Sequence, residues 1–152
     1  MNPSGTQPAL TAAGFVEVFA QGWALPKPEP FLDHFRPFVH PDATFNQPVF
    51  PTAHGVDGFE RLFRQVFAQF PDLVALVQSF AVDSDTVYIE SIFTGTLGRT
   101  PISFTACDRF DIQDGLLFQR RSHSDPLPVL LATLRRPSSW PAAARGLRRL
   151  RQ

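Results

Sequence analysis

Four charged or titratable side chains late in the chain have the types and spacing for acid–base chemistry. Asp108 lies in one strand-like run, and Arg121, His123 and Asp125 lie in the next. The two runs are separated by Asp114-Gly115, and Asp-Gly between such runs is a strong signal for a two-residue β-hairpin loop. Because strand residues alternate between two faces, this loop predicts which side chains lie together.

The predicted loop fixes the register of the hairpin. With only two residues in the loop, Asp108 lies opposite Arg121, and directly opposed residues project to the same side of a sheet. One face is therefore expected to combine an acid–base set with aromatic rings, namely Asp108, Arg121, His123, Asp125, Phe104 and Phe110. Such a face would line a pocket, whereas a slip of one residue would move the whole set to the other side.

This set of residues predicts proton transfer. Burial disfavours the charged form of a carboxylate, which moves its pKa toward the range of a general acid or base. Asp125 or Asp108 would carry the proton, His123 would take the opposite role or hold the carboxylate, and Arg121 would stabilise negative charge on oxygen. The alternative stays open that Asp108 and Arg121 form a purely structural cross-strand ion pair.

Composition indicates one globular domain. The chain has 152 residues, no net charge and 16 phenylalanines, enough for a substantial aromatic core. It has no apolar run long enough to span a bilayer and no signal-peptide pattern, so a cytoplasmic location is predicted. The single cysteine, Cys107, excludes an internal disulfide, and we interpret it as a half-buried small residue rather than a nucleophile.

Charge is distributed unevenly along the chain. Residues 1–134 hold 8 basic and 14 acidic residues, a balance of −6, whereas residues 135–152 hold six arginines and no acid. We expect a loose segment over residues 1–10, a domain over 11–134 and a flexible basic tail over 135–152. The tail could also contact an anionic surface. Nucleic-acid binding is not predicted, because the body is acidic and carries no recognised motif.

Apolar spacing predicts helices first and strands afterwards. A helix capped by Thr11 is followed by a shorter one over residues 31–38, and a third helix begins at a cap on Asp57. Strands are expected over residues 43–47, 73–82 and 87–96 and in the Asp-Gly hairpin. A loop at Leu97-Gly98 would turn Glu90 away from the apolar side, toward solvent or a subunit interface. The pattern predicts an α+β fold, with helices covering a curved antiparallel sheet of about five strands.

The order of the expected elements and the residue pattern of the strands together resemble a known family. The order is helices, then Pro41-Asp-Ala-Thr-Phe-Asn46, a glycine-containing entry into an aromatic-rich helix, and strands that end in Phe110-Asp-Ile-Gln-Asp-Gly-Leu-Leu117. Over about residues 11–134 this is similar to the SnoaL-like branch of the nuclear transport factor 2-like (NTF2-like) superfamily. The resemblance implies a cone-shaped fold, in which a strongly bent sheet and three helices enclose a pocket. It also implies homodimers built on the outer sheet face.

The resemblance suggests roles for individual residues. Cyclases of the family use carboxylate and histidine side chains on the last two strands, where His123 and Asp125 occupy similar positions. Epoxide hydrolases hold an arginine between two aspartates, a set that Asp108, Arg121 and Asp125 resemble in composition. The Asp-Pro of ketosteroid isomerases is Gln47-Pro48 here, and a neutral amide cannot act as a general base, so that chemistry is not expected.

Two function classes follow for the expected pocket. The first is a cofactor-independent enzyme, of cyclase, isomerase, hydratase or hydrolase type, acting on a small hydrophobic molecule. The second is a non-catalytic ligand-binding or dimerisation module. The expected pocket residues are Asn46, Phe104, Phe110, Phe19, Trp23 and Phe63. The histidines lack metal-ligand spacing, and no cofactor or metal is expected.

Two alternative contacts would separate the two classes. An interior Asp125–His123 contact with space beside it would favour the enzyme. A salt-bridged Asp108–Arg121 pair beside a sealed apolar cavity would favour the module.

Overall fold

The computed structural model describes residues 9–135, so most of the expected loose segment and basic tail lies outside the described residues. Within this range the chain forms, in order, α1 (Ala12–Ala24), α2 (Glu29–Phe35), the 3₁₀ helix η1 (Arg36–Phe38), β1 (Val39–Asn46), β2 (Ala53–His54), α3 (Gly55–Gln69), β3 (Val74–Asp83), β4 (Thr86–Leu97), β5 (Thr100–Gln113), β6 (Leu116–Ser124) and α4 (Leu127–Arg135). None of the helices described is long and apolar enough to cross a bilayer.

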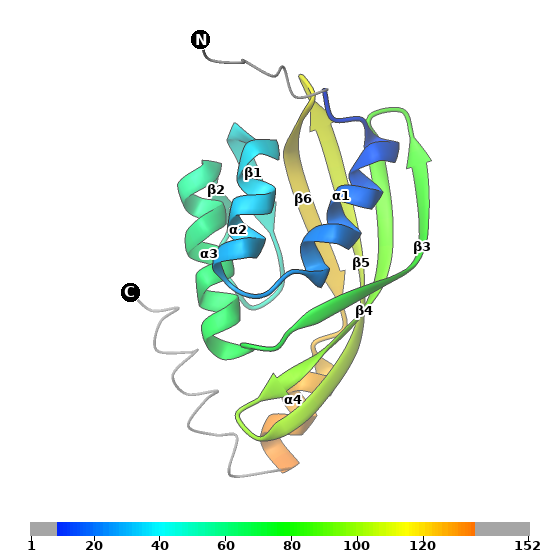
Figure 1. Ribbon diagram of the computed structural model, residues 1–152. Helices are drawn as coiled ribbons and strands as arrows, with labels where there is room; N and C mark the ends of the chain where they lie inside the picture. The colour runs from blue at the N-terminus through cyan, green and yellow to red at the C-terminus, as the bar shows by residue number, and fades with distance from the viewer. Residues whose placement is uncertain (1–8, 136–152) are drawn as a thin grey trace.

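The strands form one curved sheet with the order β2-β1-β6-β5-β4-β3. Helices α1, α2 and α3 lie on one side of it, and α4 lies at the far end beside β4 and β5 (Figure 1). The predicted α+β class is confirmed. Two details differ from the expectation: the sheet gains the short strand β2, and β1 pairs with β6 in parallel, so the sheet is mixed rather than antiparallel.

Helix boundaries follow local capping chemistry. The Oγ1 atom of Thr11 accepts a hydrogen bond from the amide of Gly14 at 3.0 Å, which confirms the predicted start of α1. Helix α3 begins earlier than expected, at Gly55 with His54 as its N-cap, and Asp57 lies inside its first turn. An acidic residue in that turn still interacts favourably with the helix dipole.

Aromatic rings from α1, α2 and α3 form the centre of the core. The ring of Phe31 contacts Trp23 at a centroid distance of 5.0 Å, Phe35 at 4.7 Å, and Phe63 and Phe67 at 4.9 Å each. Most of these contacts are tilted or edge-to-face, the arrangement that ring quadrupoles favour. The predicted aromatic faces of the helices therefore meet one another above the sheet.

The Asp-Gly turn forms as predicted, but the strands that it joins contain a β-bulge. Asp114 and Gly115 have φ of 54° and 73°, as a type I′ turn requires. After the pair Ile112 with Leu117, the next pair is Asp111 with Gln119, so Phe118 has no partner on β5. Such an extra residue shifts the rest of the hairpin by one position and exchanges the faces of β6.

The hairpin of β4 and β5 also differs in register from the prediction, but its side chains stay on the predicted faces. Leu97 pairs with Thr100, so the loop is Gly98-Arg99 and the register moves by two residues. A shift of two preserves the faces. Glu90 is exposed, as expected, and its Oε2 accepts a hydrogen bond from Ser79 Oγ at 2.8 Å.

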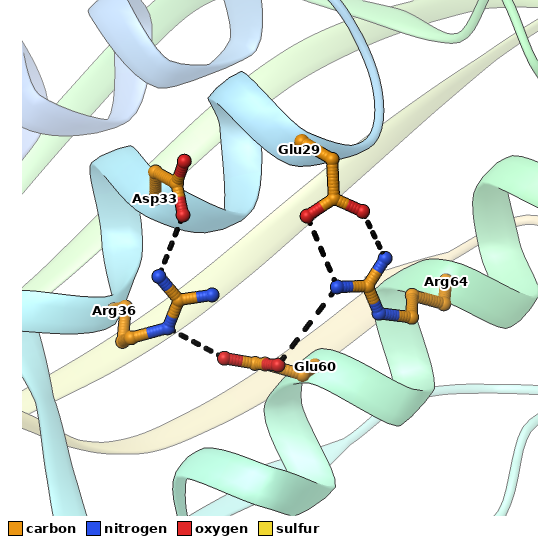
Figure 2. A network of polar contacts seen from close by, with 5 residues as sticks. All are labelled: Glu29, Asp33, Arg36, Glu60 and Arg64. Carbon is orange, nitrogen blue, oxygen red and sulfur yellow. Dashed lines mark hydrogen bonds and ion pairs between the residues drawn. The ribbon is translucent and has the colours of Figure 1, made fainter.

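A network of five charged residues joins α2 to α3 on the surface (Figure 2). Arg36 contacts Asp33 and Glu60, each at 2.6 Å, and Arg64 binds Glu29 through two nitrogens. Arg64 also lies 4.0 Å from Glu60. These contacts connect α3 to the short helix α2 and to Arg36 at the start of η1.

Candidate functional site

The bulge in β6 brings Arg120, rather than Arg121, to the inner face beside Asp108. Arg120 pairs with Phe110 across the hairpin, and only 9% of its surface is exposed. Its Nε and Nη2 atoms donate to Oδ2 of Asp108 at 3.2 and 2.8 Å. Asp108 is 1% exposed, so both charges are withdrawn from water and neutralise one another.

The expected partners of Asp108 lie on the other face, so the predicted Asp108–Arg121 pair is wrong. Arg121 pairs with Arg109, His123 pairs with Cys107, and the side chains of both are exposed. Neither residue reaches the interior. The one-residue shift at the bulge is the physical reason.

Asp125 lies beyond the end of β6 and is also exposed. Its Oδ1 accepts a hydrogen bond from the amide of Leu127 at 2.9 Å, at the first residue of α4. The interior Asp125–His123 contact that would favour an enzyme does not form, since both residues are exposed. In this structure the carboxylate satisfies a backbone donor at a helix start, a common role of aspartate.

The guanidinium of Arg120 forms one wall of a small cavity inside the cone. The other lining residues are apolar, and they come from α1, α2, α3, β1, β5 and β6: Phe15, Phe19, Trp23, Phe31, Phe35, Phe45, Phe59, Phe63, Phe110 and Leu117. The Arg120 guanidinium also lies 5.8 Å from the centre of the Phe63 ring, within cation–π range.

Four of the six predicted pocket residues line this cavity, namely Phe19, Trp23, Phe63 and Phe110. The other two do not. Asn46 accepts a hydrogen bond from Thr52 Oγ1 at 2.8 Å, and Phe104 stacks on Phe93 with a centroid distance of 5.3 Å. Aromatic helix faces thus predicted the lining better than strand alternation did.

The cavity has a volume of about 20 Å³. That space accommodates on the order of one water molecule, whereas metabolite pockets measure roughly 300 Å³ or more. A larger ligand therefore requires phenylalanine side chains to change rotamer. The observed state is a nearly filled aromatic cone with a buried ion pair at its wall.

Two buried polar atoms near the ion pair lack hydrogen-bond partners among the described residues. They are Oδ1 of Asp108 and Oγ of Ser91, and each residue is 1% exposed. Ser91 pairs with Ala106 on β5, two positions from Asp108, so the two side chains lie diagonally on the inner face. A lone hydroxyl in the apolar alternation of β4 was the sequence signal for this position.

Lys27 is a further charged group beside the aromatic cluster that the sequence did not single out. Its Nζ donates to the carbonyl oxygens of Trp23 and Leu25 at 2.6 Å each, and it lies 5.6 Å from the centre of the Trp23 ring. Burial lowers the pKa of Lys27. The side chain serves the carboxyl end of α1, where a cation interacts favourably with the last carbonyls.

Cys107 is exposed on the outer face rather than half-buried. Although the residue is exposed, the neighbouring strands remove some water from its sulfur, and this desolvation, followed by the charges of Asp108 and Glu90, raises the pKa of the thiol. A raised pKa disfavours the thiolate and so agrees with the interpretation that this residue is not a nucleophile. The described residues bring together no group of three potential metal ligands.

Comparison with known families now identifies the class of this protein. The model of the SnoaL-like domain matches residues 11–120, and the chain belongs to that family. No curated protein matches it by sequence.

Solved structures share the fold at low sequence identity. A protein assigned as a SnoaL-like polyketide cyclase from Jannaschia sp. CCS1 matches with a TM-score of 0.70 and 20% identity, covering 83% of this chain and 94% of that one. IdmH of Streptomyces antibioticus, assigned as a polyketide cyclase, matches with a TM-score of 0.65 and 18% identity, covering 80% of this chain and 96% of that one. An LEH-like epoxide hydrolase of M. tuberculosis matches with a TM-score of 0.63 and 18% identity, covering 79% of this chain and 86% of that one. At these identities the likeness establishes the fold alone.

Proposed function

We propose that the protein binds a small, largely apolar molecule inside the aromatic cone and holds one oxygen atom of it on Arg120. The observation that carries this proposal is a guanidinium that is fixed on one side by Asp108 and faces phenylalanine rings on the other. Family membership supports a small-molecule pocket in this position.

The chemistry of Arg120 specifies the ligand. Its hydrogen bonds with the described residues use Nε and Nη2, so both N–H groups of Nη1 remain for a ligand. A planar guanidinium suits a carbonyl, enolate or carboxylate oxygen, and the surrounding rings suit a flat hydrocarbon body. The ligand class is therefore a flat apolar compound with an oxygen acceptor at one end.

Binding without catalysis is favoured over acid–base turnover. The pattern expected of a module is a salt-bridged Asp108–Arg121 pair beside a sealed apolar cavity. The structure differs from it in that Arg120 takes the place of Arg121, but Asp108 is salt-bridged and the largely apolar cavity is nearly filled. His123 and Asp125, the expected proton carriers, lie outside, and Oδ2 of Asp108 already accepts two hydrogen bonds.

One observation favours catalysis as a second candidate. Oδ1 of Asp108 is buried and unpartnered among the described residues, so it would accept a proton from a ligand that reached it past Arg120. Asp108→Asn separates the two candidates, because it retains the shape of the site and removes the base. Loss of conversion with retained binding would identify an enzyme, whereas recovery of every bound compound unchanged from the wild type would identify a module.

A thermal-shift and calorimetric screen tests the binding proposal. The compounds are polyketide-like, steroid-like and terpenoid-like molecules, in matched pairs with and without a carbonyl or carboxylate group. A ligand that binds only the folded state raises its stability by mass action. We expect the wild type to prefer the oxygen-bearing member of a pair by about tenfold, the effect of one charge-assisted hydrogen bond.

The double variant Asp108→Leu with Arg120→Met is the matched test protein, because it replaces both charges by apolar groups and leaves neither unpaired. It should keep its affinity for hydrocarbon rings and lose the preference for the oxygen. Arg121→Met, at the exposed neighbouring position, should change nothing. Failure of every compound to bind the wild type, or a preference that survives in the double variant, would overturn the proposal.

A further inference from the structure

Helix α4 exposes a stripe of leucines that the fold does not bury. Leu127, Leu130 and Leu134 are 50%, 53% and 59% exposed. Spacings of three and four residues place them on one helical face. Val129 and Ala132 occupy the other side and pack against the core. The helix is therefore apolar both toward the protein and away from it.

Such a stripe differs from ordinary surface exposure. Single exposed apolar residues are normal, whereas contiguous apolar groups on one element mark an interaction surface. Helix α4 also lies at one end of the molecule, beyond the aromatic core (Figure 1). The main contact of α4 among the described elements is with β5 rather than with α1, α2 or α3.

The sequence that follows the stripe is strongly basic. Arg135 ends α4, and five further arginines follow within residues 136–152, together with Trp140, Leu147 and Leu150. Asp125 is the last acidic residue of the chain. The preceding 134 residues have the opposite balance, with 8 basic and 14 acidic residues.

We propose that α4 and the arginine-rich sequence after it bind the surface of an anionic lipid bilayer. Leucines enter the boundary between headgroups and acyl chains, and arginines neutralise the headgroup charge. The acidic body is repelled by the same surface, which orients the molecule with α4 toward the lipid. The leucines favour lipid over nucleic acid, since phosphate recognition would use the arginines and leave the apolar stripe without a role.

Vesicle flotation with the full-length protein tests this proposal. We expect binding to vesicles of phosphatidylcholine mixed with phosphatidylglycerol, none to phosphatidylcholine alone, and weakening with added salt. Leu130→Ser with Leu134→Ser should lower the affinity by roughly tenfold per leucine. Arg148→Gln with Arg149→Gln should lower it by roughly fivefold per arginine.

Two exposed positions elsewhere supply matched controls. Leu76 on β3 is 68% exposed, and Arg121 lies exposed on β6, so Leu76→Ser and Arg121→Gln should leave vesicle binding unchanged. The proposal is overturned if the wild type ignores anionic vesicles, or if the leucine pair variant binds them as well as the wild type does. It is also overturned if that variant converts a dimer to a monomer in light scattering and vesicle binding is absent, because the stripe would then serve self-association.

Discussion

The buried Asp108–Arg120 pair and the surface network between α2 and α3 place the same kinds of charge in opposite environments. The buried pair consists of two residues, and one carboxylate oxygen accepts both of its hydrogen bonds. The network shares its contacts among five residues at the surface (Figure 2). Water and salt screen the network, whereas each buried charge is compensated mainly by its partner, with the Phe63 ring beside the guanidinium of Arg120.

The comparison supports the proposed role of the buried pair. A surface network costs little to desolvate and contributes little, and it can join two helices without constraining the core. A buried ion pair is often no more stabilising than apolar residues of the same size. The position of this pair at the wall of an aromatic cavity therefore fits the proposed ligand recognition better than a role in stability.

The largest effect is expected when one buried charge loses its partner. Arg120→Met should destabilise the protein by about 3–5 kcal/mol, since it leaves the Asp108 carboxylate buried and unpaired. The double variant Asp108→Leu with Arg120→Met should instead match or exceed the stability of the wild type. Urea unfolding monitored by tryptophan fluorescence measures both. Equal losses in the single and the double variant would mean that packing, not charge, dominates at this wall.

A smaller change, this time a gain in stability, is expected when the unpartnered hydroxyl of Ser91 near this pair is removed. Ser91→Ala removes a buried hydroxyl that has no partner among the described residues, and should stabilise the protein by about 1 kcal/mol. The same unfolding experiment measures the change, with the exposed Ser103→Ala as the control. A loss of stability instead would show that the hydroxyl has a partner in solution, such as a bound water.

The fold could be predicted because it depends on local signals that agree with one another. Thr11 caps α1, aromatic spacing defines α3, and Asp114-Gly115 forms the predicted turn. Each signal involves residues close in sequence, so propensity and pattern suffice. The aromatic lining could be predicted for the same reason, because Phe19 and Phe63 lie on the inner faces of their helices.

The charged part of the site could not be predicted, because the register of β6 depends on a single extra residue, Phe118, at the bulge. Leu116, Leu117 and Phe118 form an apolar run, so alternation gives no register where the bulge lies. The distant strand β1 also meets this region, since the ring of Phe118 contacts His40 at 5.2 Å. Neighbouring arginines at 120 and 121 then made either register plausible from sequence alone.

Asp72 offers a way to separate hydrogen bonding from charge pairing. Its carboxylate accepts from the amide and the hydroxyl of Thr96, at 2.8 and 2.7 Å, and these bonds lower its pKa. Because its pKa is lowered on folding, the ionised Asp72 stabilises the protein at pH values above its unfolded pKa near 3.8. This stabilisation is lost as the pH falls through the folded pKa. Asp72→Asn should cost no more than about 1 kcal/mol at neutral pH.

The pH and salt dependence of Asp72→Asn provide the check. The difference from the wild type should shrink on acidification and change little with salt, because the partners of this carboxylate are uncharged. A strong salt dependence would mean that the Asp72 carboxylate stabilises the protein through charge pairing instead. Thermal unfolding across a pH series, at low and high salt, measures both.

The smallest effect is expected in the surface network, and it should depend on both pH and salt. The hydrogen bond from Arg64 lowers the pKa of Glu29, so its contribution is present above the unfolded value near 4.5 and disappears as the pH falls through the folded value. Glu29→Gln should therefore lower the melting temperature slightly at neutral pH and low salt, and not at all in acid or in high salt. The buried pair should show no comparable salt response, because ions do not reach it. If salt weakened both sites equally, the Asp108–Arg120 pair would be accessible to water, and a wetter, more open cone would replace the filled cavity as the state to which ligands bind.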